Sequence, residues 1–312
     1  MPTPRIAFFL LLILALTRPA AAQNPVQWSG NVSNAVSRAA EQSLPLLFWV
    51  TESEDDSDDD LSDAQSHSFR DPGVVRIIRS RFVPVRVGRT SKVLKEAERL
   101  GLPTSHGLYC AVLTHDGRLL DQMGPGEIAD PVAFAAHLES AFERHCDDLL
   151  QKEILPILND PEATKARVRL AARTVWRLNI RKADKEVIRI LDRTDLTPSE
   201  RSRLYELLAA LGTQNCIAAL LDRADDKAAA AALQKADAAA LEWLTPELPK
   251  DDAEITDRQL TAYLATARVC RMTATKPKEW WSKASQTERR KELDRVTAKA
   301  EAVLEFSRES QR

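Results

Sequence analysis

Four cysteines are the residues of this sequence best suited to covalent or redox chemistry, and they are widely separated: Cys110, Cys146, Cys216 and Cys270. The chain contains no C-x-x-C motif and no cysteine–histidine group with the spacing of zinc ligands. An oxidising compartment would permit disulfides. Cys216 and Cys270 lie in the same half of the chain, so we expect these two to pair if a bridge forms. Buried free thiols that act as small apolar residues are the alternative.

Cys110 is the residue on which a redox hypothesis would rest. It lies in an apolar segment that predicts a core strand, and folding would have to bring Cys146 close to it. A disulfide between them requires Cα atoms within about 7 Å of each other. An atypical thiol oxidoreductase that uses Cys110 is one hypothesis, and a buried, unreactive strand cysteine is the other.

Carboxylates are concentrated in residues 52–63, where acidic and serine residues dominate and no basic residue occurs. Closely spaced carboxylates provide the oxygen ligands that calcium prefers, although the glycine and the terminal glutamate of an EF-hand loop are missing. A calcium-stabilised structural module is one interpretation, and a solvated acidic loop is the other. His67, His106 and His115 could form a metal site with aspartates, or they could be ordinary surface histidines.

Other chemistries are not indicated. No glycine-rich phosphate loop, nucleophile elbow or H-E-x-x-H motif occurs, and we assign no catalytic residue, metal or cofactor. The formal net charge of −2 gives no reason to expect a nucleic-acid partner. The adjacent pair Trp280-Trp281 could anchor a protein partner. Because neighbouring residues on a helix point to different sides, the alternative is one buried ring and one partly exposed ring.

The first half of the chain must position these residues with alternating helices and strands. Residues 32–43 have apolar residues at helical spacing, residues 45–50 predict a buried strand, and Asp71-Pro72 begins a helix. Residues 82–87 predict a strand with one buried face or, because of Pro84, an edge strand. We also expect a helix at 92–100, strands at 108–113 and 118–123 joined by an Asp116-Gly117 turn, and a helix from Asp130-Pro131 to about Cys146. This pattern predicts a mixed α/β domain.

The second half of the chain shows no convincing strand pattern. Helical patterning recurs, with Pro156, Pro161 and Pro198 between segments, so short antiparallel helices in a bundle or solenoid are the natural interpretation. No fixed internal period is clear. The segments with helical patterning are 149–158, 163–178, 185–191, 199–211 and 216–221, and two later helices are expected at 256–272 and 287–306. Residues 227–241 are alanine-rich with charges interspersed.

The N-terminal residues have the features of a secretory signal peptide. Arg5 precedes an unbroken apolar run over residues 6–16, and Ala20-Ala21-Ala22 forms a cleavage signal before Gln23. The run is too short for a comfortable membrane span, and an uncleaved anchor is the alternative. We therefore expect a signal peptide over residues 1–22 and an exported protein, periplasmic or extracellular, without a membrane segment after cleavage.

Several short blocks in the first half occur in an order that resembles the exported thioredoxin-like proteins of bacteria. Trp28 and residues 44–48 resemble the opening of that family, residues 69–75 resemble its Asp-Pro-x-Val helix start, and residues 101–104 resemble its Gly-x-Pro-Thr segment. Residues 82–85 resemble the strand that follows in the family, and residues 113–117 resemble its strand end and Asp-Gly turn. The resemblance covers about residues 26–146 and implies a thioredoxin-like fold.

Two departures limit what this resemblance implies. Where the family has its Cys-x-x-Cys motif, residues 52–61 contain no cysteine, so both thiols of thioredoxin-type exchange are absent from that position. After Pro103, Ser105-His106-Gly107 intervenes before the next strand, which favours a short insertion. The alternative places Leu108 at the position of the family's cis-proline. A cis Leu102-Pro103 bond is therefore a hypothesis.

Together these observations predict an α/β thioredoxin-like domain over residues 23–146, with a mixed sheet flanked by helices, and an all-helical domain over residues 147–312. Because the dithiol of the family is absent, we expect a redox-inactive module that binds or scaffolds an extracytoplasmic protein or peptide. The binding surface would be a helical surface or a groove beside the family's active-site position. By resemblance, Trp49, Pro103 and Thr104 would border that groove.

Overall fold

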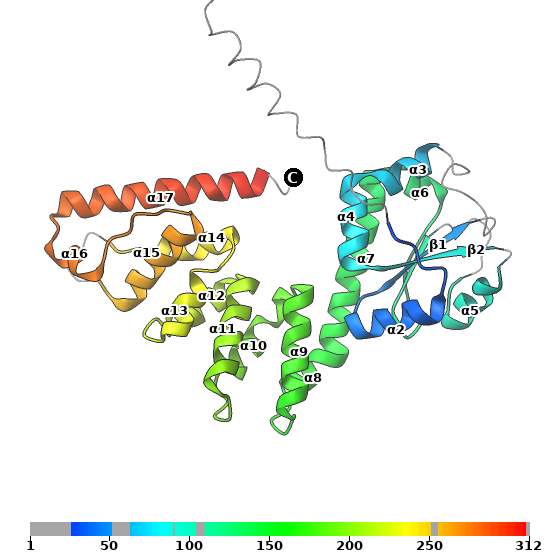
Figure 1. Cartoon of the computed structure of the whole chain (residues 1–312), viewed down its shortest axis with the longest axis horizontal. Coiled ribbons are helices and arrows are strands. Elements are labelled where there is room, and N and C mark those ends of the chain that lie inside the picture. Colours follow the sequence, from blue (N-terminus) through cyan, green and yellow to red (C-terminus); the bar gives the residue numbers. More distant parts are fainter. Residues whose placement is uncertain (1–25, 52–62, 90, 104–109, 251–254, 310–312) are drawn as a thin grey trace, which may run out of the picture. The chain divides into compact units, whose positions relative to one another are not determined.

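The computed structural model describes residues 26–51, 63–89, 91–103, 110–250 and 255–309 (Figure 1). The chain forms two compact units, one up to Asp147 and the other from Asp148 onward. The expected signal peptide, residues 1–22, lies outside the described residues, as does the acidic segment 52–62. None of the described helices is both long and apolar enough to span a membrane.

The first unit is built around a four-stranded mixed sheet with the strand order β2-β1-β3-β4. β1 (Leu46–Thr51) pairs in parallel with β2 (Val83–Gly88) and antiparallel with β3 (Cys110–Leu113). β3 pairs antiparallel with β4 (Leu119–Met123), and Gly117 adopts a φ of 90° in the turn between them. The expected mixed α/β unit, followed by a helical part, is therefore confirmed.

β2 lies at one edge of the sheet, where Pro84 favoured it. The segment that precedes the first helix runs along this edge. Ser29 donates its N–H to the Pro84 carbonyl at 3.0 Å and accepts from the Arg86 N–H at 3.0 Å. These bonds satisfy backbone groups that an uncovered edge strand would leave unpaired.

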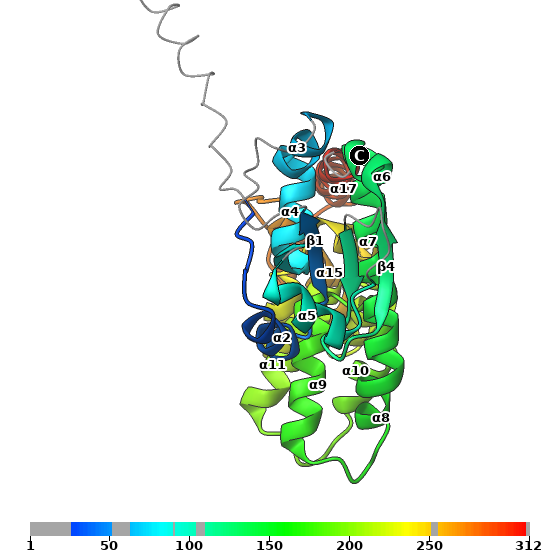
Figure 2. The ribbon, with the colours of Figure 1, turned by 90° about the vertical axis from the view of Figure 1, so that its right-hand side faces the viewer.

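Helices cover both faces of the sheet (Figure 2). α2 (Val32–Gln42) and α5 (Lys92–Leu100) pack on the face that carries Leu46, Phe48 and Val50. On the opposite face, Trp49 contacts Phe69, which contacts Phe134 of α7 (Pro131–Leu149). This alternation follows from strand geometry, since successive side chains point to opposite faces.

Local sequence explains where these helices begin and end. α4 (Pro72–Arg81) begins after Asp71, whose Oδ1 accepts hydrogen bonds from the N–H groups of Gly73 and Val74 at 2.8 and 3.0 Å. α5 ends at Gly101, which has a φ of 112°. Two short helices that the sequence pattern did not predict are α3 (Asp63–Arg70) and α6 (Pro125–Ala129).

The second unit is helical, and no strand occurs in residues 148–250 and 255–309. α7 continues through a π-helical turn, η2 (Leu150–Ile154), into α8 (Leu155–Leu158). Helices pack on their neighbours in the chain, since α11 contacts α9, α10, α12 and α13. This nearest-neighbour packing is typical of helical arrays. The helices are α9 (Lys165–Leu178), α10 (Asp184–Ile190), α11 (Pro198–Leu211), α12 (Gln214–Leu221), α13 (Lys227–Leu233), α14 (Leu241–Leu244), α15 (Asp257–Val269), α16 (Lys278–Lys283) and α17 (Gln286–Glu309).

The last helices of this unit pack around Tyr263 and Trp281. Trp281 is 1% exposed and meets the Tyr263 ring edge-on with ring centroids 5.1 Å apart. Trp280 is partly exposed, and the Lys276 ammonium lies 5.2 Å from its ring centroid. The alternative of one buried and one partly exposed tryptophan is therefore confirmed. The Tyr263 hydroxyl donates to Glu292 Oε1 at 2.6 Å, which ties α15 to α17.

Candidate binding groove

Trp49, which the resemblance placed at the border of a groove, belongs to the core of the first unit. Its side chain is 1% exposed, and its ring centroid lies 5.1 Å from that of Trp28 and 4.9 Å from that of Phe69. Pro103 is partly buried. No peptide bond between described residues is cis, so the cis hypothesis for Pro103 is wrong. Thr104 lies outside the described residues. Trp49 therefore presents no surface to a ligand.

None of the four cysteines forms a disulfide, so Cys216 and Cys270, both buried, match the alternative of buried thiols and not the alternative of a bridge. Cys270 packs beside Leu241 and Ala300. Cys216 lies in the first turn of α12, where its N–H donates to Thr213 Oγ1 at 3.2 Å. The two thiols thus occupy different packing environments. Burial raises the pKa of Cys216 to about 11 and also raises the pKa of Cys270.

Cys110, on which the redox alternative rests, is fully buried in β3. Burial raises the pKa of its thiol far above the ordinary value. Because the thiolate is the nucleophile in disulfide exchange, this environment suppresses the reactive form at neutral pH. Cys146 in α7 is partly exposed. The surroundings of Cys110 are those of a structural core cysteine.

The residues considered for a metal site do not converge where the structure describes them. His67 is exposed in α3, His115 lies in the turn after β3, and His106 falls outside the described residues. Among the described residues, no group of three or more His, Cys, Asp or Glu side chains is placed to hold a metal ion. The calcium hypothesis concerns residues 52–63 and stays a prediction, because 52–62 lie outside the described part.

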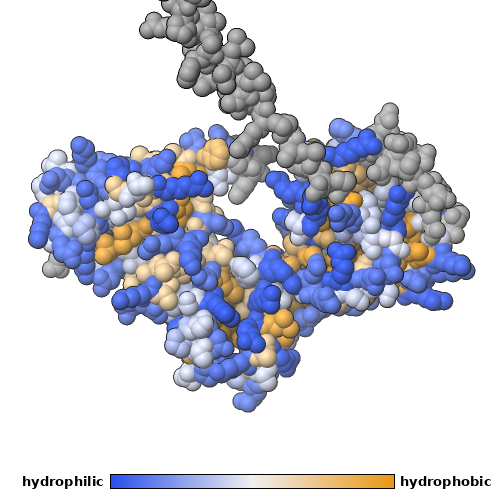
Figure 3. Space-filling model, viewed as in Figure 1, coloured by the Kyte–Doolittle hydropathy of each residue, from blue (hydrophilic) through white to orange (hydrophobic). Residues whose placement is uncertain are grey.

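A groove of ≈ 1060 Å³ lies between α9 and α11 of the second unit. This volume slightly exceeds the roughly 300–1,000 Å³ that ligand sites in proteins occupy. The two helices form its walls, and residues at and after the end of α10 close one end of it. Figure 3 shows hydrophobic and hydrophilic residues side by side over these helices.

Apolar side chains from both helices form the floor of the groove. Val168 and Ala172 come from α9, and Leu204 and Leu207 come from α11; all four are buried. They are spaced by three or four residues within each helix, so each pair lies on one helix face. The floor therefore continues the hydrophobic packing between α9 and α11 outward to the surface.

Two large apolar side chains of α9 line the groove yet remain in solvent. Leu170 is 65% exposed and Trp176 is 54% exposed. Arg173 lies midway between them, so the three residues follow one another at a spacing of three along the helix. Exposed apolar residues beside a hollow are typical of interaction sites, and tryptophan is prominent among the residues that dominate binding energy.

A row of basic residues runs along α9. Lys165, Arg169 and Arg173 line the groove at intervals of four residues, and Arg177 continues the row. Like charges at this spacing destabilise a helix by about 0.2–0.5 kcal/mol for each pair. Burial, and then repulsion from Arg173, lower the pKa of Arg177. The basic residues of this row therefore repel one another, which destabilises α9.

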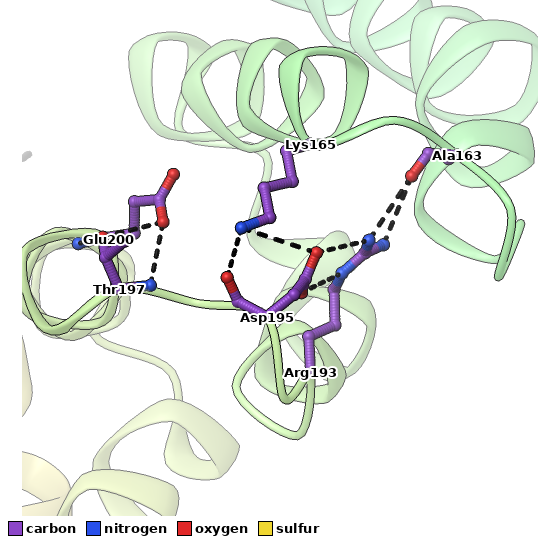
Figure 4. A network of polar contacts seen from close by, with 6 residues as sticks. All are labelled: Ala163, Lys165, Arg193, Asp195, Thr197 and Glu200. Carbon is purple, nitrogen blue, oxygen red and sulfur yellow. Dashed lines mark hydrogen bonds and ion pairs between the residues drawn. The ribbon is translucent and has the colours of Figure 1, made fainter.

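Asp195 neutralises the cations at one end of the groove (Figure 4). Its carboxylate accepts hydrogen bonds from Arg193 Nε at 3.2 Å and Nη2 at 3.3 Å, and Lys165 Nζ lies 3.7 Å from Oδ2. Arg193 also donates to the Ala163 carbonyl at 3.4 Å. The hydrogen bonds from Arg193 hold the pKa of Asp195 below its ordinary value. Lys165 and Arg193 are thus paired within the protein.

The two acidic residues that line the groove also have local partners. Thr197 donates from its N–H and hydroxyl to Glu200 Oε2 at 2.9 and 2.8 Å, which forms a capping box at the start of α11 (Figure 4). These bonds lower the pKa of Glu200. Glu206 pairs with Lys235, with Oε1 2.6 Å from Nζ. Neither carboxylate is therefore left to neutralise the middle of the groove by direct contact.

Three arginines that line the groove have no direct partner among the described residues. Arg169 and Arg173 face the groove from α9, and Arg203 faces it from α11; all three are exposed. Within the described part of the chain, none of them has a side-chain hydrogen bond or an ion pair closer than 4 Å. The groove thus combines an apolar floor, two exposed apolar side chains and unpaired cations.

The sequence of α9 contains one signal for this site. The segment 163–178 shows basic residues every four positions together with Leu170 and Trp176. By itself such a row is typical of a solvated helix face. Its meaning depends on α11 lying beside α9, which sequence spacing does not reveal.

In comparisons with protein-family models, curated proteins and solved structures, the chain matches none of them.

Proposed function

We propose that this chain is an exported, redox-inactive thioredoxin-like protein whose helical unit binds a protein or peptide segment in the groove between α9 and α11. The observation that carries the proposal is the groove itself, which joins a buried apolar floor to exposed Leu170 and Trp176. Such a surface is costly to leave in water unless a partner covers it.

The thioredoxin-like part of the proposal is supported by strand order. A parallel pair, β1 with β2, is followed by an antiparallel hairpin, β3 with β4, and by the closing helix α7. This is the order that the family resemblance implies. A fold of this kind serves many functions, so the function must be argued from a site.

The absence of redox activity is supported by the cysteines. No cysteine occurs in residues 52–61, where the family has its attacking and resolving thiols. The thiol that lies in the sheet, Cys110, is buried with a raised pKa. Exchange requires an accessible thiolate and a second thiol that resolves the mixed disulfide. The use that remains for the fold is recognition.

A thiol–disulfide reductase assay tests the redox part. The chain from Gln23 onward is assayed beside a Cys110→Ser variant. We expect no turnover from either protein. Turnover that disappears in the variant would instead support the atypical oxidoreductase.

A peptide titration tests the binding part. Fluorescein-labelled amphipathic peptides of acidic, neutral and basic composition are titrated with the same chain, and polarisation is measured. At least one class should bind and should weaken in Trp176→Ala. Val132→Ser is the control, because Val132 is 78% exposed on α7, outside the groove, and should have no effect. If no class binds, the proposed function is wrong.

A further inference from the structure

We infer that the groove between α9 and α11 selects an acidic amphipathic helix, with carboxylates along one flank and apolar residues beside them. This inference rests on the proposed binding function and names the chemistry of the partner. It follows from the distribution of paired and unpaired charge, from the spacing of the cations, and from the position of the exposed apolar side chains.

The unpaired charge in the groove has one sign. Lys165 and Arg193 are held by Asp195 at one end, and Lys235 is held by Glu206. Arg169 and Arg173 on one wall and Arg203 on the other have no hydrogen-bonding or ion-pair partner among the described residues. A ligand that lies along the groove therefore meets guanidinium groups on both walls. Planar guanidinium groups bind carboxylates with two parallel hydrogen bonds.

The spacing of the cations matches a helical partner. Arg169 and Arg173 are four residues apart, which corresponds to about 6 Å along the axis of α9. Carboxylates at positions i and i+4 of a partner helix have the same separation. The apolar residues of that partner, at i+3 and i+7, would then lie over the floor and against Leu170 and Trp176. This is the helix-in-groove mode of peptide recognition.

The electrostatics also disfavour the other charge classes. A basic peptide would add a third like charge beside Arg173 and Arg177, where burial, and then repulsion from Arg173, already lower the pKa of Arg177. A neutral peptide would cover the guanidinium groups without replacing their water, which is unfavourable for a charged group. An acidic peptide relieves the repulsion and pairs the arginines. Selection among the three classes is therefore a direct consequence of the groove.

The probes are three fluorescein-labelled helical peptides of the length of α9, 14 residues. All have leucine at one helix face, and their flanking positions carry glutamate, glutamine or lysine. The full chain from Gln23 is titrated with each peptide at low salt and polarisation is measured. We expect the glutamate peptide to bind about 10-fold or more tightly than the other two, since complementary charge both attracts the partner and rejects the wrong one. Raising the salt concentration should reduce this preference.

Exchanging the sign of the charge gives the sharpest variant. Replacing Arg169 and Arg173 together, Arg169→Glu with Arg173→Glu, should abolish the preference for the glutamate peptide and create a preference for the lysine peptide. A protein that had merely lost its fold would not gain affinity for a new ligand. Arg167→Glu is the matched control, because Arg167 is exposed on the same helix but does not line the groove. It should keep the preference of the unchanged chain.

The outcomes separate this inference from the proposed function. If all three peptides bind equally, and Trp176→Ala weakens all of them, the groove binds peptides but the inference about acidity is wrong. If the lysine peptide binds most tightly, the inference is also wrong. If none binds, the inference and the proposed function fail together. Preference for the glutamate peptide that reverses in the double variant supports both.

Discussion

Arg173→Gln should make the second unit more stable, although it removes a charged residue from its surface. Arg173 stands four residues after Arg169 and four before Arg177, so it takes part in two like-charged pairs on α9. Each such pair destabilises a helix by about 0.2–0.5 kcal/mol. Glutamine has nearly the helix propensity of arginine, and Arg173 has no hydrogen bond to lose among the described residues. The expected gain is therefore about 0.4–1 kcal/mol at low salt.

The assay is urea unfolding of the unchanged chain and the variant at low and at high salt, followed by circular dichroism at a helical wavelength. The gain should shrink at high salt, because the screening length falls to about 3 Å at 1 M salt. Arg203→Gln is the control. Its charge lies three residues from Glu200 and three from Glu206, so its removal should give no stabilisation.

Two results would refute this reasoning. If Arg173→Gln destabilises the protein at both salt concentrations, Arg173 has a stabilising contact and is not an unpaired cation. If Arg203→Gln stabilises the protein by as much as Arg173→Gln, the effect reflects net charge and not the row on α9. Either result would contradict the proposal that the unpaired arginines of the groove bind a partner.

Three further predictions concern burial and the cysteines. In urea unfolding, Trp176→Ala should change stability by less than about 0.5 kcal/mol, whereas Trp281→Ala, at a side chain only 1% exposed, should lose about 3–5 kcal/mol; equal effects would contradict the exposure of Trp176. Burial raises the pKa of Cys216 from 9.0 to about 11. The neutral thiol therefore contributes its full stabilisation below pH 9, and this stabilisation is lost as the pH rises towards 11. The total loss in the free energy of unfolding is about 3 kcal/mol. Cys216→Ala should therefore show a shallower loss of stability over this range, and an identical pH profile would refute the assignment. With a thiol reagent under native conditions, partly exposed Cys146 should react first and buried Cys110 only on unfolding, as mass spectrometry of the labelled peptides would check; early labelling of Cys110 would revive the redox alternative.

Much of the first unit could be predicted because its elements are set by local chemistry. Asp71-Pro72 begins α4 since the carboxylate accepts from two free N–H groups of the first turn. Pro84 favoured an edge strand, and β2 lies at the edge. Asp116-Gly117 forms the turn between β3 and β4 because glycine adopts a positive φ without strain.

Features that depend on packing were harder to predict. Residues 227–241 are rich in alanine, a strong helix former, yet α13 ends at Leu233, and a separate short segment places Ala240 and Leu241 in the core. Helix propensity is a weak preference that burial of this kind overrides. Cys216 and Cys270 are both buried without a disulfide, and a choice between a bridge and buried thiols depends on packing that sequence spacing does not reveal.

The binding groove could not be predicted because it belongs to two helices and not to one. The row of basic residues and the exposed Leu170 and Trp176 are all visible in the sequence of α9. The apolar floor of the groove, however, also needs Leu204 and Leu207 from α11. Trp49 illustrates the opposite error. The family resemblance placed it at the border of a groove, whereas contacts with Trp28 and Phe69 bury it within β1.

Hydrogen–deuterium exchange of the full chain from Gln23, with and without a saturating amount of the glutamate–leucine peptide, tests the central claim most directly. The amides of α9 and α11 should exchange more slowly in the presence of the peptide, because the partner covers both walls of the groove. The amides of β1, in the first unit, should be unaffected. Protection that appears only outside residues 165–211, or no protection anywhere, would contradict the account.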